Sequence, residues 1–194
     1  IMNTSINLGR HIVGLDRPCY IVAEMSGNHG ADINKAKEII CSAKEAGANA
    51  VKLQTYLPNT ITLNCDKEDF RIPKSSPWSS YETFYSLYEK AHTPWEWHHE
   101  LFAEAQRAEI DIFSSPFDLT AVDLLEEIDC PAYKIASAEI TDIPLLEKVG
   151  STHKPVIVST GLATLSDISL AVETLRNSGC KYLILLKCTA AYPA

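Results

Sequence analysis

The sequence contains no apolar run that approaches the roughly 20 residues needed to cross a lipid bilayer. Basic residues are in the minority, because 17 Lys and Arg stand against 25 Asp and Glu and the net charge is -8. A chain of this charge has no general electrostatic attraction for nucleic acid or anionic lipid. We therefore expect no nucleic-acid partner and no membrane association, and local cations would have to bind any anionic substrate.

Paired cysteines are missing as well. The six cysteines show no C-x-x-C spacing, in a chain of 194 residues that is long enough to build a core without disulfides. The first residues lack the basic region, the apolar stretch and the cleavage site of a secretory signal. These absences predict reduced thiols and a cytoplasmic protein. Ile1 is not an initiator residue and Ala194 directly follows an expected strand and its loop, so we also expect a fragment.

Several signatures of cofactor and catalytic sites are absent too. There is no Walker loop and no G-x-G-x-x-G, which argues against nucleotide and dinucleotide cofactors, and there is no G-x-S-x-G elbow. The six histidines contain no H-x-x-x-H pair. His98 and His99 follow Pro94 on an expected helix, where we expect them to be solvated rather than to act as ligands.

Short runs rich in Val, Ile and Leu alternate with amphipathic stretches, a pattern typical of parallel strands joined by helices. Most strands begin about 20 to 30 residues after the previous one, a period that fits a doubly wound sheet or a (β/α)8 barrel. Six strands are expected, at 20–24, 50–54, 110–114, 132–136, 156–160 and 182–187.

Helix signals lie between these strands. Apolar residues at helical spacing predict one helix across 36–43, ended by Gly47, and another across 168–175, ended by Gly179. Thr164 with Asp167 forms a capping box, and Thr93 is expected to cap a helix that has Pro94 at its first position.

A long excursion interrupts the alternation of strands and helices over residues 57–93. It contains three prolines and then an apolar helical pattern that includes Phe84 and Tyr88. A segment of this length is uncommon in a compact domain, so it predicts a lid or flap. A tolerated surface insertion is the alternative that spacing alone leaves open.

Polar side chains gather where the expected strands end, which is where barrels build their sites. They are Glu24, Lys52, Gln54, Ser114, Ser115, Lys134, Ser137, Ser159, Lys187 and Thr189. Strand alternation places Lys52 and Gln54 on one face, and likewise Lys187 and Thr189. Three converging lysines would demand an anion, either carboxylates such as Glu24 and Glu139 or a bound phosphate or carboxylate. The alternative is that the lysines reach the rim and stay solvated.

Two further features accompany these strand ends. Ser159, Thr160 and Gly161 supply a hydroxyl and backbone donors of the kind that hold phosphate, although the same tripeptide forms ordinary turns. His29 lies shortly after Glu24, where it either contacts a substrate or supports a neighbour by hydrogen bonding.

Six segments in a fixed order make the sequence resemble the sialic acid synthase family over nearly its whole length. They read IVAEMSGNH (21–29), AVKLQTY (50–56), FSSPF (113–117), YKIAS (133–137), IVSTG (157–161) and KCTAAYP (187–193). Within that family, AEMSGNH, LNCDKEDF (63–70) and TPWEWH (93–98) are most similar to the pseudaminic acid branch.

This resemblance implies an α/β fold, a (β/α)8 TIM barrel of which residues 1–194 hold the first six βα units. It implies a cytoplasmic transferase that condenses phosphoenolpyruvate with an N-acylated amino sugar aldehyde, giving a nine-carbon pseudaminic-type ulosonic acid and phosphate. It also implies a divalent metal, Mn or Mg, a C-terminal antifreeze-like domain that is absent from this chain, and a homodimer in which that domain reaches the partner's site. The metal ligands are expected downstream of residue 194, none in this segment, so we expect this chain alone to be inactive.

The matching motifs also assign roles to residues of this chain. Lys52, Lys134, Ser137 and Ser159 would hold the phosphate and carboxylate of the donor, with Ser115 near them. Glu24, Gln54 and Tyr192 would face the acceptor sugar, and Glu139, Thr189 and His29 complete the expected substrate-binding set. Glu24, Lys52 and Lys134 are the expected catalytic residues. Ala190 lies where relatives commonly have Ser or Asn, so one polar contact to the donor is expected to be missing or supplied elsewhere.

Three rival hypotheses stay open at this point. The same chemistry on another acceptor would give N-acetylneuraminate or legionaminate. A Schiff-base aldolase would instead use a desolvated lysine such as Lys134 or Lys187 as its nucleophile. A sugar-binding module without chemistry is the non-enzymatic alternative.

Overall fold

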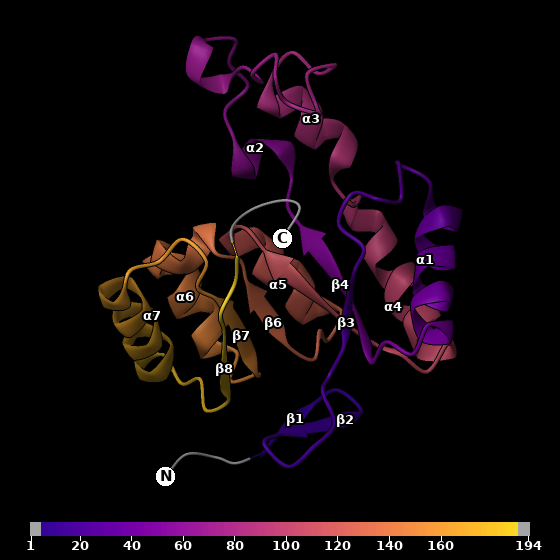
Figure 1. Ribbon diagram of the computed structural model, residues 1–194, viewed down its shortest axis with the longest axis vertical. Coiled ribbons are helices and arrows are strands. Elements are labelled where there is room, and N and C mark those ends of the chain that lie inside the picture. Colours follow the sequence, from indigo (N-terminus) through magenta and orange to yellow (C-terminus); the bar gives the residue numbers. More distant parts are fainter. Residues whose placement is uncertain (1–4, 190–194) are drawn as a thin grey trace.

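The computed structural model describes residues 5–189, and its centre is a six-stranded parallel sheet (Figure 1). The strands are β3 (Val22–Glu24), β4 (Ala50–Thr55), β5 (Asp111–Pro116), β6 (Tyr133–Ile135), β7 (Val156–Ser159) and β8 (Leu183–Leu186). All six expected strands are therefore confirmed, with ends shifted by one or two residues. The strands neighbour one another in chain order, without the reversal that defines a doubly wound sheet. The sheet is the N-terminal part of a TIM barrel.

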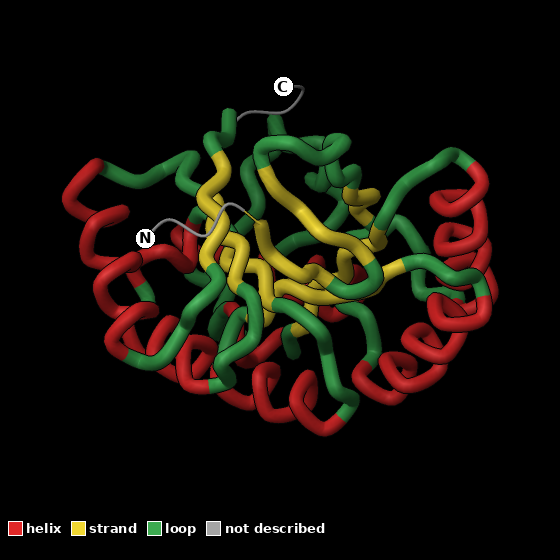
Figure 2. The backbone as a smooth tube through the Cα atoms, turned by 90° about the horizontal axis from the view of Figure 1, so that it is seen from below, coloured by secondary structure: helices red, strands yellow, loops and turns green. Residues whose placement is uncertain are grey.

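The major helices lie in an arc around the outer face of this curved sheet (Figure 2). They are α1 (Ile33–Glu45), α4 (His98–Arg107), α5 (Leu119–Glu127), α6 (Ile143–Ser151) and α7 (Leu165–Asn177). Each helix presents an apolar stripe to the strands, as Ala36 and Ile40 do on α1. The expected capping box of Thr164 and Asp167 is present at the start of α7.

One expected cap is wrong. The chain after Pro94 forms a short 3-10 turn, η2 (Trp95–Trp97), before α4 begins at His98. The side chain of Thr93 caps neither element, because its hydroxyl bonds to the buried ring of His29 across 64 residues of sequence. A tertiary hydrogen bond has replaced the local one.

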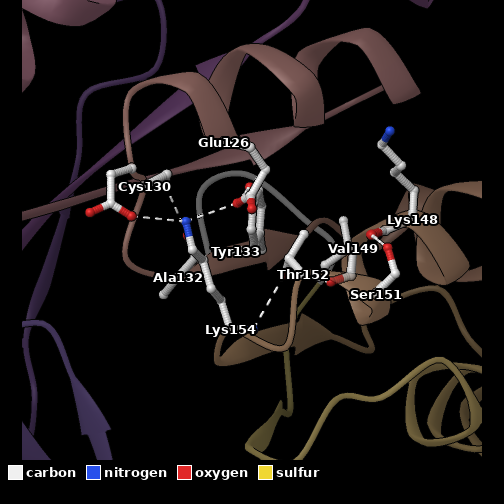
Figure 3. A network of polar contacts seen from close by, with 10 residues as sticks. Glu126, Cys130, Ala132, Tyr133, Lys148, Val149, Ser151, Thr152 and Lys154 are labelled. Carbon is white, nitrogen blue, oxygen red and sulfur yellow. Dashed lines mark hydrogen bonds and ion pairs between the residues drawn. The ribbon is translucent and has the colours of Figure 1, made fainter.

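Two apolar clusters hold the helices to the sheet. The larger one joins β5–β8 to α5, α6 and α7, and the smaller one joins β4 and β5 to α1 and α4. Tyr133 is fully buried in the larger cluster, and its hydroxyl donates to Glu126. Glu126 also pairs with Lys154, whose ammonium lies 2.9 Å from its carboxylate, so this polar network ties α5 to the start of β7 (Figure 3).

An antiparallel hairpin that the sequence patterns did not predict lies at the amino ends of the strands. It comprises β1 (Ser5–Leu8) and β2 (His11–Gly14). The carboxylate of Asp111, buried at the start of β5, accepts hydrogen bonds from the backbone of Arg10, the ring of His11 and the hydroxyl of Tyr20. Gly9 has φ +58, and a side chain there would lie 2.4 Å from the Asp111 carboxyl carbon, so only glycine fits this turn.

The expected excursion over 57–93 rises from the carboxyl end of β4 (Figure 1). It contains α2 (Pro58–Ile61), the 3-10 turn η1 (Glu68–Phe70) and α3 (Phe84–Ala91), and an isolated bridge between Arg71 and Thr83 closes its outer loop. The remaining short element, η3 (Ala138–Thr141), follows β6 at the same end of the sheet. Within residues 5–189 no helix combines the length and apolar character that crossing a membrane requires.

Candidate active site

Lys52 lies on β4 and points along the inner face of the sheet at its carboxyl end. Only 6% of the residue is exposed, and its ammonium lies 2.8 Å from Glu24 Oε2 and donates to the hydroxyl of Ser115 at 3.2 Å. Glu24 is opposite Lys52 in the register of β3 and β4, and its side chain is about half exposed. Lys52 is therefore neutralised on one side by a carboxylate that still reaches solvent.

Lys134 on β6 is the second buried lysine, with 9% of the residue exposed. Its ammonium donates to the hydroxyl of Ser159 at 2.6 Å and to the carbonyl of Ile135 at 3.1 Å. Among residues 5–189 no carboxylate lies within ion-pair distance of it. Burial, together with repulsion from Lys52, lowers the pKa of Lys134 to about 8. Lys134 is thus a buried cation held only by neutral groups.

The two lysines belong to one site, since the charge of Lys52 contributes to the lowered pKa of Lys134 and both lysines lie on strands of the same parallel sheet. The expected third lysine, Lys187, is exposed beyond β8 and does not join them. Within residues 5–189 the two ammonium groups have one paired carboxylate, that of Glu24 beside Lys52. Such a site favours an added anion, because a desolvated positive charge without a partner is costly.

Ser137 and the Ser159–Gly161 turn frame this cationic pair. The backbone N–H of Gly161 donates to the hydroxyl of Ser137 at 3.1 Å, so the loops after β6 and β7 are joined. The hydroxyl of Thr160 donates a hydrogen bond to the carbonyl of Leu186, so it has a structural role. The thiol of Cys188 donates to Ser159 at 3.1 Å. The hydroxyl of Ser159 therefore accepts hydrogen bonds from Lys134 on β6 and from Cys188, which lies just after β8.

Glu139 lies on η3, directly after the strand that carries Lys134. Burial raises the pKa of its carboxyl group. Its Oε2 atom is buried and has no hydrogen-bond partner among the described residues. An unpaired buried oxygen of this kind is rare in folded proteins and indicates a position for a ligand or an ordered water.

The other expected site residues occupy different environments. Gln54 is half buried, lies opposite Ser115 in the register, and shares the inner face with Lys52, as strand alternation predicted. Thr189 is exposed past the end of β8. Tyr192 and Ala190 lie outside the described residues. The structure thus brings five of the expected residues into two sets of contacts. Lys52 contacts Glu24 and Ser115, and Lys134 contacts Ser159.

His29 is fully buried and has a supporting geometry. Its Nδ1 accepts from the backbone N–H of Ala31, so Nε2 carries the proton and donates to Thr93 Oγ1 at 3.2 Å. Its ring also packs edge-on against Trp97. Both ring nitrogens are occupied, so the supporting interpretation of His29 fits better than a direct contact.

His98 was expected to be solvated, and this expectation is wrong. The residue is fully buried, and burial lowers its pKa to about 4. Its Nδ1–H donates to the carbonyl of Pro94, and its Nε2 accepts from Thr55, whose hydroxyl in turn contacts Ser114 at 2.6 Å. This buried chain fastens α4 to β4 and β5 directly behind Ser115. The hydroxyls of Thr55 and Ser114 inside two apolar strands were the signal that could have revealed it.

Residues 39–194 match the NeuB family. The chain belongs to the NeuB family. The resemblance to sialic acid synthases that the six motifs carry is thereby confirmed.

Relatives of this NeuB-family chain include enzymes with different products. Pseudaminic acid synthase of Helicobacter pylori is 49% identical over 178 residues, which cover 92% of this chain and 52% of the relative. N,N'-diacetyllegionaminic acid synthase of Legionella pneumophila is 36% identical over 186 residues, covering 93% of this chain and 51% of the relative. The chain spans about half the length of the curated relatives it matches.

A solved structure confirms the architecture of the NeuB-family barrel. The crystal structure of N-acetylneuraminic acid synthetase from Leptospira borgpetersenii, in complex with citrate, superposes with a TM-score of 0.82 at 32% identity. The match covers 98% of this chain and 61% of that one.

The divalent metal that the family resemblance implies does not fit the residues described here. Within residues 5–189 no group of three or more His, Cys, Asp or Glu side chains is arranged to hold a metal ion. The two fully buried histidines, His29 and His98, already use both ring nitrogens in hydrogen bonds.

Proposed function

We propose that the protein, at its full natural length, condenses phosphoenolpyruvate with an N-acylated amino sugar aldehyde and releases phosphate. The product would be a nine-carbon ulosonic acid of the pseudaminic type. The observation that carries this proposal is Lys134, a buried ammonium 2.6 Å from Ser159 that no carboxylate of residues 5–189 neutralises. Membership of a family whose synthases form carbon–carbon bonds supports it.

The donor would bind at the two lysines. Phosphoenolpyruvate carries a phosphate and a carboxylate, and the ammonium groups of Lys52 and Lys134 offer charge-assisted hydrogen bonds to both. The hydroxyls of Ser115 and Ser159, each already within hydrogen-bond distance of one lysine, would add neutral donors. Because the lysines are buried, their attraction for an anion is screened less than at a surface.

The acceptor would lie on the solvent side of Glu24. One oxygen of this carboxylate is bound to Lys52, which leaves the exposed remainder to accept a hydrogen bond from a sugar hydroxyl or to take up a proton. Gln54, on the same face and half buried, can donate to and accept from the same sugar. Glu24 is therefore proposed to belong to the acceptor subsite. Lys52, which contacts both Glu24 and Ser115, would lie between the acceptor subsite and the donor subsite.

The pseudaminic assignment is finer than the family itself, and relative identity supports it. The pseudaminic acid synthase of Helicobacter pylori is 49% identical, against 36% for the legionaminic acid enzyme of Legionella pneumophila. Legionaminate or N-acetylneuraminate synthesis is the nearest alternative. Divalent metal ligands outside the described residues and a homodimer, both implied by the resemblance, are part of the same proposal.

A Schiff-base aldolase is a second candidate, and the lowered pKa of Lys134 favours it. An amine with a pKa of about 8 is partly neutral at physiological pH and can attack a carbonyl.

The deciding experiment incubates the complete protein with phosphoenolpyruvate, a divalent metal and a 6-deoxy hexose bearing two acetamido groups. Phosphate release that depends on the sugar supports the synthase, and equal or better turnover with N-acetylmannosamine would overturn the pseudaminic assignment. Parallel treatment with pyruvate and borohydride tests the aldolase, which predicts a covalent adduct on Lys134. A sugar-binding module would show binding of the sugar with neither phosphate release nor an adduct.

A further inference from the structure

The hydroxyl of Ser159, at the end of β7, has two hydrogen-bond donors beside its oxygen. The ammonium of Lys134 on β6 lies 2.6 Å from that oxygen, and the sulfur of Cys188, which follows β8, lies 3.1 Å from it. Ser159 is buried and Cys188 is half buried. The hydrogen bonds at this one oxygen therefore determine which role the hydroxyl can take toward a ligand.

Lys134 can act only as a donor while it is charged. Its pKa is about 8, so the ammonium form predominates at pH 7, and an ammonium has three hydrogens and no lone pair. Two of these hydrogens are donated to Ser159 and to the carbonyl of Ile135. The first lone pair of the Ser159 oxygen is therefore occupied, and the third hydrogen of Lys134 has no partner within residues 5–189.

The thiol of Cys188 has one hydrogen and two acceptors within reach. Besides Ser159, the carbonyl oxygen of Leu186 lies 3.6 Å from the sulfur. That oxygen already accepts from the backbone N–H of Thr160 at 3.1 Å and from the Thr160 hydroxyl at 2.9 Å, which together use both of its lone pairs. The shorter contact and the free acceptor are both at Ser159, so the thiol donates there.

A serine hydroxyl has two lone pairs and one hydrogen. With Lys134 and Cys188 bound to the two lone pairs, the Ser159 oxygen can accept no further hydrogen bond. Its hydrogen is free, since no acceptor for it exists within residues 5–189. A ligand that satisfies this hydroxyl must therefore supply an oxygen with a lone pair, and an anion oxygen could accept from the remaining hydrogen of Lys134 as well.

We propose that Cys188 is a positioning residue of the donor subsite: its thiol occupies the second lone pair of Ser159 and so directs the hydroxyl hydrogen of Ser159 to an oxygen of phosphoenolpyruvate. This inference rests on the proposed function, because phosphoenolpyruvate is the anion that would fill the site. Cys188 acts through Ser159 and does not itself bind the donor. Without the thiol, the hydroxyl could rotate among several orientations, and ordering it on binding would lower the affinity.

The test measures phosphoenolpyruvate binding to the complete protein by isothermal titration. Cys188→Ala removes the thiol, whereas Cys188→Ser replaces it with a hydroxyl that can donate the same hydrogen bond. Cys41→Ala is the matched control, because Cys41 is also half buried and its thiol also has a side-chain partner, Glu104 on α4. The KM for the acceptor sugar is measured in parallel by phosphate release.

Cys188→Ala should raise the dissociation constant of phosphoenolpyruvate about three- to tenfold, the effect expected for one neutral hydrogen bond. Cys188→Ser should bind within about twofold of wild type, because it keeps a donor beside Ser159. Cys41→Ala should bind as wild type does. The acceptor KM should stay within about twofold in all three variants, since the thiol acts on the donor subsite alone.

A double-mutant cycle separates positioning from a general structural role. Ser159→Ala should itself weaken donor binding about ten- to hundredfold, the loss expected for a hydrogen bond to a charged group. In that background Cys188→Ala should have no further effect, because the hydroxyl through which the thiol acts is gone. A general structural role would instead add its loss to that of Ser159→Ala.

Three results would overturn the inference. Donor binding that is unchanged or tighter in Cys188→Ala would show that the thiol does not direct the hydroxyl hydrogen to the donor. Binding in Cys188→Ser as weak as in Cys188→Ala, or additive losses in the double variant, would indicate a structural role. If wild type binds no phosphoenolpyruvate, the proposed function fails and this inference fails with it, an outcome distinct from the other three.

Discussion

The ammonium of Lys134 donates to the hydroxyl of Ser159 at 2.6 Å, across the gap between β6 and β7, and no carboxylate of residues 5–189 shares that charge. Lys52, on the other side, is paired with Glu24. The two buried lysines are therefore unequal. Lys52 has a carboxylate partner within residues 5–189 and Lys134 has none, so under the proposed function Lys134 is the more sensitive probe of donor binding.

Replacing Lys134 with Met should weaken phosphoenolpyruvate binding tens- to thousands-fold, because a buried charge-assisted contact is worth about 2 to 5 kcal/mol. The fold should survive, since the change removes an uncompensated buried charge. Isothermal titration of the complete protein with phosphoenolpyruvate measures the effect. Lys181→Met, at an exposed position before β8, is the control and should bind as wild type does. Unchanged affinity in Lys134→Met would show that this lysine does not contact the donor.

Donor affinity should fall as the pH rises through about 8, the pKa to which burial and Lys52 lower the ammonium of Lys134. Above that pH Lys134 loses its positive charge in the ligand-free protein, and binding should weaken by up to about tenfold per pH unit. The ligand-free protein should meanwhile gain stability from pH 8 toward 10.5, because the unfolded chain binds more protons than the native one there. Dissociation constants from pH 7 to 9.5 test the first point. A wild-type profile as flat as that of Lys134→Met would contradict it.

The buried His98 should make the protein sensitive to acid. Its pKa is about 4 in the fold and near 6.5 when unfolded, so between these values the unfolded state binds the extra proton and stability falls as the pH falls. From pH 6.5 to 5 this loss should reach about 2 kcal/mol. Urea unfolding of the complete protein at both pH values measures it. His98→Gln should lose this part of the pH dependence, whereas the exposed His99→Gln should keep it. Identical slopes in all three proteins would refute the assignment.

Asp111 should matter for stability and leave the chemistry unchanged. Its carboxylate accepts from Arg10, His11 and Tyr20 at the amino ends of the strands, far along β5 from Ser115. Asp111→Asn should cost about 2 to 4 kcal/mol, since hydrogen bonds to a buried charge are strong. KM values for both substrates should not change. Asp129→Asn, at an exposed position, is the control, and thermal unfolding with parallel kinetics is the measurement. A large change in KM with intact stability would contradict this division.

The 194-residue chain expressed alone should associate and show no sugar-dependent phosphate release. In the described sheet β3 and β8 are the outermost strands, and each has a free edge of backbone groups. Leu185 and Leu186 on β8 are 47% and 39% exposed. Analytical ultracentrifugation and the phosphate assay check this, with the complete protein as the control. A monodisperse, active monomer would require the metal site to be sought within these residues.

The strands were predictable because their signal is local. Val51 and Leu53, like Val156 and Val158, are fully buried apolar residues in short runs bounded by turns, and such runs predict buried parallel strands. The strand ends were predictable for the same reason: alternation alone placed Lys52 and Gln54 on one face. The site could be inferred to this extent without knowing how the strands pair.

The remaining features depend on contacts between distant residues. The residues that follow Thr93 are typical of a helix start, so the sequence predicts that Thr93 caps a helix. In the structure its hydroxyl instead forms a hydrogen bond with the ring of His29. The sequence predicts a solvated His98 because its buried partners are distant in sequence. Thr55 lies on the strand before it and Ser114 on the strand after it. No window of sequence contains both members of such pairs. The burial of Lys134 without a carboxylate is likewise a property of the assembled sheet.

The hairpin of β1 and β2 has a consequence for the order of folding. Its residues precede the sheet in the sequence, yet the carboxylate that anchors this region, that of Asp111, follows Tyr20 by 91 positions and Arg10 by 101. A two-stranded hairpin alone is marginally stable in water, and closing so long a loop is an entropic cost that only the finished contact repays. The hairpin should therefore be among the last elements to dock, after β4 and β5 have paired and brought the Asp111 carboxylate into place.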